Sequence, residues 1–553
     1  MSTTPRAGLI VHGRIATLAG ADGPGWVDAL GIARGRVIAA GTRDAVGAAA
    51  GPGTRVLTLA PDEVAIPGLT DAHLHLVETA LARSRVQLEG VTGIDGFVDG
   101  IRAAAAASRD ADAWIEGAGW HPDLLGRWPT ADDIEGAAPG RRVVLWAHDH
   151  HALVASRRAL AEAGVGEGSP DPDGGVIRRD AAGAPTGVLH ETAARLVVSG
   201  IPAATVATLT AAMRPLIAEL LALGVVAAHD PGGLSQQDGL RGPFEAYRAL
   251  AAAGELGMRV HPCVRPEQLD AAQAAGLHSG RPLGPDPLDR LRLGWLKTFA
   301  DGSLGSRTAA LLEPLVRGPG EPEPPNGGLG VWLVPPDELR AQAARAADMG
   351  IATQIHGIGD AAVRAALDAL APTVGATPLM PRVEHAQLVH PEDVPRFAAL
   401  GIAASMQPVH VRSDEEQARR LWGERAETGS YALGALARSG AVIPTGTDAP
   451  VEPIDPWPGL ACAVTRSAPG WPAGTPPLGP SNALTLWRAL RAACVDPAIS
   501  AGERDRGRLV PDQRADLVVL TAAALREPVE TGGALWSARP RLVLVDGEIV
   551  VGG

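Results

Sequence analysis

Short apolar runs separated by glycine turns occur near both ends of this chain of 553 residues. They lie at residues 8–18, 28–41, 53–59, 515–520 and 540–553. Such runs are typical of hairpins and meanders of β-strands. We therefore expect the two ends of the chain to build one small β-sandwich domain together, from residues 1–63 and 500–553.

The middle of the chain has a different rhythm, in which apolar runs that end in polar residues alternate with stretches of helical periodicity. Eight such runs are candidate strands, at residues 64–75, 224–230, 258–264, 291–302, 351–357, 381–388, 402–408 and 441–448. This alternation predicts an α/β fold, a (β/α)8 TIM-like barrel over residues 64–499. Several polar residues fall where a strand ends, and barrel enzymes place their active sites at that end.

The first gap between candidate strands is too long for a single crossover. Roughly 150 residues separate His75 from the second candidate strand, against about 30 for a simple βαβ unit. Residues 80–205 are therefore expected to form an insertion after the first barrel strand. Tryptophan, histidine and glycine concentrate there, as in a cap over a pocket, and Trp120 is a candidate to line that pocket.

Charge and cysteine content restrict the partners and the compartment. A net charge of −13 and a pI of about 5.6 argue against nucleic acid or an anionic membrane as partner. Three distant cysteines without a CxxC pair support neither a disulfide framework nor a zinc ribbon. The chain shows no signal-peptide pattern and no apolar run of transmembrane length. We expect a soluble cytoplasmic protein that acts on a small molecule, with homo-oligomer formation left open.

Composition also singles out one residue, because Lys297 is the only lysine among the 49 Lys and Arg residues. A buried lysine can lose its proton, whereas arginine stays charged. Neutral lysine can form a Schiff base, act as a general base or take up CO2 to become a carbamate, which is a carboxylate able to bridge two metal ions. The simplest alternative is a leftover surface lysine in a sequence biased toward arginine.

Histidine and aspartate mark the ends of several candidate strands. The run DAHLH places His73 and His75 two positions apart, so both point to the same side and form a good imidazole pair for a zinc-like ion. His356, His385 and Asp448 end three further candidate strands. Together with Lys297 these residues predict a metal centre at one end of the barrel. Glu384, next to His385, should point away from it if the strand alternates regularly.

The runs PGLTDAHLH, KTFADGSLGSRTA, IHGIGDAAV, VEHAQ and GTDAPVEPIDP resemble motifs of the metal-dependent amidohydrolase superfamily. More narrowly, they resemble amidohydrolase family 3, the group that includes N-substituted formamide deformylases. The resemblance runs nearly from end to end of the chain. It is specific for the family and says little about the substrate.

The resemblance implies one or two divalent metal ions, with zinc expected and manganese or iron as alternatives. His73, His75 and Asp448 would hold one ion, and His356 and His385 a second. Lys297, as a CO2-derived carbamate, would bridge the two, with an unmodified ligand or base as the alternative. The ions would activate hydroxide, and Asp448 would carry the proton from the attacking water to the leaving nitrogen.

Candidates for substrate contact follow from position and from the resemblance. His229 ends the second candidate strand, and Asp301 and Ser303 follow Lys297; a structural role at the barrel rim is the alternative. In the insertion, relatives tend to carry a Gly-His pair that matches His151, although His150 stands where the glycine is expected.

The leading interpretation is hydrolysis of a C–N amide bond other than a peptide bond, in an N-substituted formamide or another N-acyl small molecule. A deaminase or a cyclic-amide hydrolase on the same fold is the runner-up. Two alternatives belong to other classes. One is a Schiff-base lyase that uses Lys297, and the other is a binding protein that kept the fold and lost activity.

Overall fold

The computed structural model describes residues 6–20, 23–83, 85–108, 110–147, 152–172, 175–191, 193–232, 242–305, 307–318 and 325–552. The chain divides into two compact units. Unit 1 comprises Met1–Glu78 and Met213–Gly553, and unit 2 comprises Thr79–Ala212. The structure is an α/β protein, as the sequence predicts.

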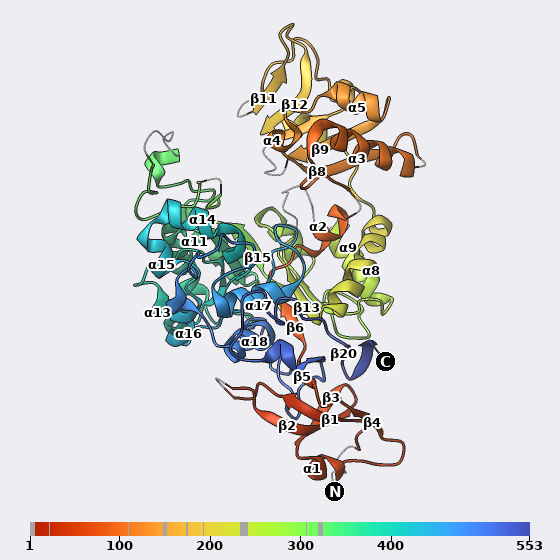
Figure 1. Ribbon diagram of the computed structural model, residues 1–553, viewed down its shortest axis with the longest axis vertical. Helices are drawn as coiled ribbons and strands as arrows, with labels where there is room; N and C mark the ends of the chain where they lie inside the picture. The colour runs from red at the N-terminus through yellow and green to blue at the C-terminus, as the bar shows by residue number, and fades with distance from the viewer. Residues whose placement is uncertain are drawn as a thin grey trace. The chain divides into compact units, whose positions relative to one another are not determined.

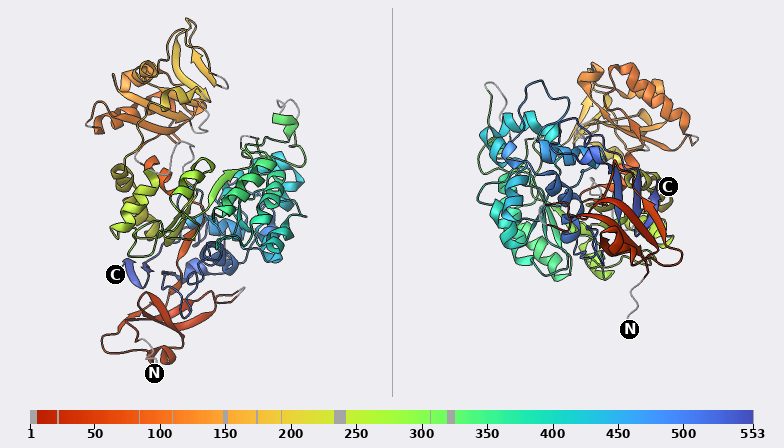
Figure 2. Two further views of the ribbon diagram at one scale, coloured as in Figure 1. Left: turned by 180° about the vertical axis from the view of Figure 1, so that it is seen from behind. Right: turned by 60° about the horizontal axis from the view of Figure 1, so that its bottom comes forward.

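Strands from both ends of the chain share one sheet in unit 1. Among the described residues its order is β21-β20-β19-β5-β1-β2-β3, with β4 beside β1. The bounds are β1 Leu9–Ala16, β2 Trp26–Ala33, β3 Arg36–Gly41, β4 Arg55–Thr58, β5 Glu63–Pro67, β19 Leu517–Thr521, β20 Leu542–Val545 and β21 Glu548–Val551. The two ends meet where β5 pairs antiparallel with β19, with Ile66 opposite Val518 (Figure 2). Valine, isoleucine and leucine fill these strands, which suits a half-buried pleated surface.

The central strands of unit 1 form two parallel sheets. β6 (Leu69–Asp71), β13 (Val225–Asp230) and β14 (Arg259–Pro262) make the first, in the order β14-β13-β6. The second has the order β15-β16-β17-β18, with β15 Leu296–Phe299, β16 Thr353–Gly357, β17 Arg382–His385 and β18 Ala403–Ser405. Nearly every residue in these strands is buried, as expected when helices cover a parallel sheet.

Isolated bridges connect these two sheets. Val264 pairs with Leu296 between the first sheet and the second, and Met406 pairs with Thr445 after β18. The eighth candidate run, 441–448, is not a regular strand, but Thr445 accepts a backbone hydrogen bond of 3.0 Å from Ala72 beside β6. Closure into a (β/α)8 barrel and the β-sandwich form of the terminal sheet stay predictions.

Helices follow most of the central strands, and Figure 1 shows α8 and α9 beside β13 in yellow-green. The bounds are α1 Arg43–Gly47, α2 Leu76–Ala82, α8 Val206–Ala222, α9 Gly242–Ala252, α10 Leu269–Ala274, α11 Pro336–Asp348, α12 Asp360–Leu370, α13 Val394–Leu400, α14 His410–Trp422, α15 Glu424–Gly429, α16 Leu433–Ser439, α17 Pro456–Thr465, α18 Leu486–Cys494 and α19 Asp496–Ser500. In the described part of the chain, no helix combines the length and the apolar character needed to cross a membrane.

Unit 2 has its own sheet and its own core. The sheet order among the described residues is β11-β12-β10-β9-β8-β7, with β7 Val86–Gln87, β8 Trp114–Trp120, β9 Arg142–Ala147, β10 Ala152–Ala155, β11 Gly175–Arg179 and β12 Pro185–Glu191. The helices are α3 Gly93–Ala107, α4 Pro122–Leu125, α5 Ala131–Ala137, α6 Arg157–Glu162 and α7 Ala194–Val198. Phe97, Ile101 and Leu145 anchor one of its hydrophobic clusters. The predicted insertion falls within this unit, and its role as a cap stays a prediction.

Candidate metal centre

His73 and His75 are held by hydrogen bonds between two segments that lie far apart in the sequence. The backbone N–H of Asp448 donates to the carbonyl oxygen of His73 at 2.7 Å, and that of His75 donates to Ala449 at 3.0 Å. The side chains of His73, His75 and Asp448 are all buried. Leu74 between the two histidines is also buried, and both imidazoles face the same oxygen of Asp448 although β6 ends before them, at Asp71.

Each imidazole of this pair is oriented by a contact at its Nδ1 atom. Nδ1 of His73 lies 2.5 Å from Oε2 of Glu384, and Nδ1 of His75 lies 2.5 Å from the carbonyl oxygen of Gly232. Each Nε2 then faces Oδ1 of Asp448, at 3.5 Å from His73 and 3.4 Å from His75. A histidine that donates through Nδ1 presents the lone pair of Nε2, which is the arrangement of most metal-bound histidines.

The second oxygen of Asp448 faces two more histidines. Its Oδ2 lies 3.3 Å from Nε2 of His410 and 3.9 Å from Nδ1 of His385. The ligand atoms of His73, His75 and Asp448 all lie within 4.8 Å of one another, and so do those of His385, His410 and Asp448. Asp448 and His385 have positive φ angles of 63° and 72°, which is uncommon outside glycine and clusters at functional sites.

Lys297 lies on β15 and is buried with the histidines. Its Nζ has no hydrogen-bond partner within the described part of the chain and lies 4.8 Å from the ring centroid of Phe299. Burial lowers the pKa of Lys297 to about 8, against the opposing effect of Glu384. A fraction of the amine is therefore neutral near pH 7, as Schiff-base or carbamate formation requires.

His356 ends the next strand, and its ring centroid lies 4.6 Å from that of His385. Its Nε2 lies 3.0 Å from the carbonyl oxygen of Gly302 and 3.6 Å from Asp301. Burial, together with Lys297, lowers the pKa of His356 to about 3. The imidazole is therefore neutral at physiological pH.

The donor set fits a divalent metal ion. Nε2 of His73 and Nζ of Lys297 are buried nitrogen atoms without a hydrogen-bond partner among the described residues. Burial and Lys297 lower the pKa of His73 to about 4, so its imidazole is neutral. Burial acts to raise the pKa of Asp448, but the hydrogen bond from His410 holds it well below its usual range. A neutral imidazole such as that of His73, next to a carboxylate, belongs to a ligand set typical of zinc and similar ions. His410 differs, because burial acts to lower its pKa but Asp448 and Glu452 raise it to about 10.

Two residues of this centre were not expected from the sequence. His410 begins α14, two residues beyond the candidate strand 402–408, and the only signal for it is a histidine just after a strand end. Its Nδ1 lies 3.7 Å from Glu452, which also accepts a hydrogen bond of 2.6 Å from Ser413. The expectation that Glu384 points away is wrong, since its carboxylate contacts His73. The positive φ of His385 breaks the regular alternation at the end of β17.

Three predicted substrate contacts of unit 1 have partners within the protein. His229 is fully buried, with Nδ1 at 2.9 Å from the guanidinium of Arg382. The Asp301 carboxylate is also fully buried and accepts hydrogen bonds of 2.8–3.0 Å from three backbone N–H groups, those of Ala310, Ile358 and Gly359. Ser303 is partly buried, and its backbone N–H donates to Thr308 at 3.1 Å. His229 and Asp301 are therefore bonded to groups of the protein itself, next to the candidate metal ligands.

The predicted contacts in the insertion belong to unit 2. Trp120 is fully buried, and its Nε1 donates a hydrogen bond of 2.8 Å to the carbonyl oxygen of Leu145. Its ring packs edge-on against Trp128, with centroids 5.7 Å apart. This is the environment of a core side chain. His151 lies outside the described residues.

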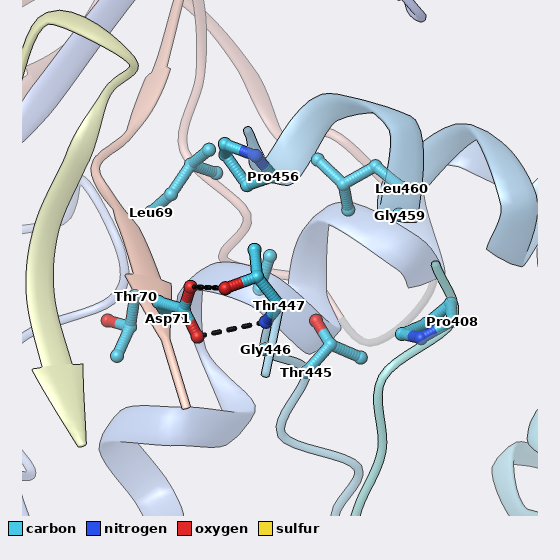
Figure 3. A pocket seen from close by; sticks show the side chains of 11 residues that line it. Leu69, Thr70, Asp71, Pro408, Thr445, Gly446, Thr447, Pro456, Gly459 and Leu460 are labelled. Carbon is cyan, nitrogen blue, oxygen red and sulfur yellow. Dashed lines mark hydrogen bonds between the residues drawn. The ribbon is translucent and has the colours of Figure 1, made fainter. Parts of the chain in front are cut away.

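A small cavity lies beside Asp71, between β6, the segment 445–447 and α17 (Figure 3). Asp71 accepts hydrogen bonds from the hydroxyl and the backbone N–H of Thr447, at 2.6 Å and 3.0 Å. The cavity measures about 20 Å³, which is room for one water molecule and not for a substrate. The contacts around it hold the first and last central segments together.

Gly446 lies in the seam between segments 71–75 and 445–449. The variant Gly446→Ala tests how closely these two segments must approach. The new Cβ would lie 2.6 Å from Oδ1 of Asp71 and 3.0 Å from Cα of His73, both too close. We expect a loss of about 1–3 kcal/mol in the free energy of unfolding from overpacking, together with weaker zinc binding. Denaturant titration and zinc competition measure the two effects.

Gly459→Ala is the matched control, because a Cβ on α17 meets its nearest atom, in Val409, at an ordinary distance of 3.6 Å. That variant should keep both stability and zinc affinity. Equal zinc affinity in the two variants would show that the seam does not position His73.

The chain is similar to known proteins over nearly its whole length. The sequence profile of the amidohydrolase family matches residues 60–551. The chain is 31% identical over 535 residues to the protein LONG AFTER FAR-RED 3 of Arabidopsis thaliana, covering 94% of this chain and 89% of the relative. It is 26% identical over 537 residues to the N-substituted formamide deformylase of Arthrobacter pascens, covering 93% of each.

A solved structure is also similar over nearly the whole chain. The crystal structure of a metal-dependent hydrolase from Pyrococcus horikoshii OT3 superposes with a TM-score of 0.76 at 27% identity, covering 94% of this chain and 98% of the other. The sequence profile covers the whole of unit 2 and all of unit 1 except residues 1–59 and 552–553. The chain therefore belongs to the amidohydrolase family.

Proposed function

We propose that this protein is a metal-dependent hydrolase that cleaves a C–N amide bond in a small molecule, such as an N-substituted formamide or another N-acyl compound. One observation carries the proposal. The carboxylate of Asp448 lies between the His73–His75 pair on one side and His385 and His410 on the other. Membership of the amidohydrolase family supports it.

The residues that would hold the ions are the predicted ones. His73, His75 and Asp448 would hold one divalent ion, with zinc as the proposed metal, and His356 and His385 would contribute to a second. Lys297 would join them as a carbamate, which supplies the anionic bridge that the imidazoles lack. A divalent ion held there supplies a Lewis acid for the substrate carbonyl and lowers the pKa of a bound water.

Asp448 would act as the proton shuttle. Its pKa lies well below the usual range, so the carboxylate is ionised at neutral pH and can accept the proton of the attacking water. It would then pass that proton to the nitrogen of the leaving group, because an amine leaves poorly unless it is protonated. His410, 3.3 Å from Oδ2, limits the directions in which the carboxylate can turn.

The same residues would serve a deaminase or a cyclic-amide hydrolase, and only the substrate separates these activities. A Schiff-base lyase would use Lys297 but leaves the His73–His75 pair and Asp448 without a role. An inactive binding protein is disfavoured because every expected ligand position carries its ligand residue. We further propose a (β/α)8 barrel, with residues 80–205 inserted after its first strand, and a cytoplasmic location.

Metal removal tests the proposed function directly. The purified protein should contain about one to two zinc-like ions per chain. Chelator-treated protein should be inactive on a panel of N-formyl, N-acyl and cyclic amides, and reloading with zinc or manganese should restore turnover of one class. Elemental analysis and product detection measure the two. Full activity of metal-free protein would refute the mechanism.

Lys297→Arg keeps the positive charge but cannot form a carbamate. We expect turnover to fall to background and the metal content to drop below that of the wild type. Lys297→Glu restores a carboxylate on a shorter stem and should keep more metal than the arginine variant. If Lys297→Arg turns over like the wild type, Lys297 is an ordinary buried lysine.

Asp448→Asn keeps the shape of the side chain and removes its basicity. Turnover should fall by about 10²–10⁴ while most of the metal remains on the histidines. Asp455→Asn is the control, because Asp455 caps α17 through the N–H of Trp457 and asparagine caps equally well. An active Asp448→Asn variant would exclude Asp448 as the shuttle.

A further inference from the structure

We infer that Arg382 is a positioning residue of the metal centre, which acts through Glu384 to fix the imidazole of His73. The inference rests on the proposed metal-dependent function and adds a second layer to it. Arg382 and Glu384 both lie on β17, two positions apart, and both are completely buried. Neither was expected from the sequence to serve the metal centre.

The first step is the contact between Glu384 and His73. Oε2 of Glu384 lies 2.5 Å from Nδ1 of His73, so the imidazole donates there and turns Nε2 toward Asp448. Nε2 has no other hydrogen-bond partner among the described residues. The direction of the metal-facing lone pair of His73 is therefore set by the position of one carboxylate.

The second step is the contact between Arg382 and Glu384. Nε of Arg382 forms an ion pair of 2.9 Å with Oε1, the oxygen of Glu384 that does not face His73. An isolated carboxylate in such a buried place would be costly, and the guanidinium compensates its charge. The two oxygens of Glu384 thus have different partners, and Arg382 decides where the carboxylate lies.

Arg382 is itself fixed on its remaining sides. One terminal nitrogen lies 2.9 Å from Nδ1 of His229, and the other donates to Oε1 of Gln354. The guanidinium carbon lies 3.8 Å above the ring of Trp295, whose N–H donates to the carbonyl oxygen of Met380 at 2.8 Å. A planar group with donors in fixed directions can meet all these partners at once, and a lysine cannot.

Several buried side chains next to the candidate metal centre contact Arg382. His229, Gln354 and Trp295 are all fully buried and touch Arg382 from three sides. A buried ion pair is seldom more stabilising than a well-packed apolar pair of the same size. A role in holding a metal ligand explains why charged groups lie in the core here.

Zinc affinity tests the inference without any substrate. The variants are Arg382→Lys, Glu384→Gln and their combination, in the full-length chain, with competition against a chromophoric chelator as the measurement. Glu384→Gln and Arg382→Lys should each weaken zinc binding by about 10–100-fold, the usual effect of losing a partner that orients a ligand. Because Arg382 acts through Glu384, the double variant should lose no more than Glu384→Gln alone.

Arg259→Lys is the matched control. Arg259 is another buried arginine of unit 1, paired at 2.7 Å with Asp516 and also with Asp546, and it has no contact with the histidines in the described structure. It should lower the thermal stability of the metal-free protein and leave zinc affinity within about twofold.

Gln354→Leu is the second variant, for the case in which Arg382→Lys does not fold. It removes only one acceptor of Arg382 and should weaken zinc binding by a few-fold.

Wild-type affinity in Arg382→Lys, or a double variant whose losses simply add, would overturn the inference. If Arg382→Lys does not fold, wild-type zinc affinity in Gln354→Leu would overturn the inference instead. A wild-type protein that binds no zinc is a separate outcome, because it removes the proposed metal-dependent function itself.

Discussion

The seam between segments 71–75 and 445–449 is the contact on which the rest of the site depends. Asp71 binds Thr447 through two hydrogen bonds, and backbone N–H groups of Asp448 and His75 cross the seam in opposite directions. These bonds place residues more than three hundred positions apart within hydrogen-bonding distance. Asp448 can face the His73–His75 pair only because its own backbone is bonded to His73.

Around this seam, burial and charge are balanced locally. Burial alone would neutralise carboxylates and favour neutral imidazoles. Three histidines follow that tendency, because burial lowers the pKa of each: His73, His356 and His385. Glu384 and Asp448 stay ionised because Arg382 and His410 lie beside them. Burial acts to lower the pKa of His410, but the carboxylates of Asp448 and Glu452 raise it to about 10. Burial acts to raise the pKa of Glu384, and Arg382 and His73 together lower it to about 2. The centre therefore combines neutral nitrogen ligands with fixed negative charges, the combination that a divalent cation requires.

Sequence patterns identified the α/β class and the segments that carry the candidate metal ligands, because both depend on local periodicity and on residue type. His73 and His75 were visible as a pair two positions apart. His410 and Glu384 were not, for physical reasons. His410 enters from the first turn of a helix, and the positive φ of His385 breaks the strand alternation from which Glu384 was expected to point away. Burial of Trp120 and His229 depends on packing between distant segments, which no local pattern encodes.

The pairing of β5 with β19 has a consequence for how the chain is made. The terminal sheet can be completed only after Val518, the partner of Ile66, has been synthesised. At about 5–20 residues per second, synthesis of the intervening chain takes tens of seconds. Throughout that time β5 has an unpaired edge on the ribosome, and such edges invite association with other chains. This edge of β5 therefore stays open to association with other chains until β19 has been made.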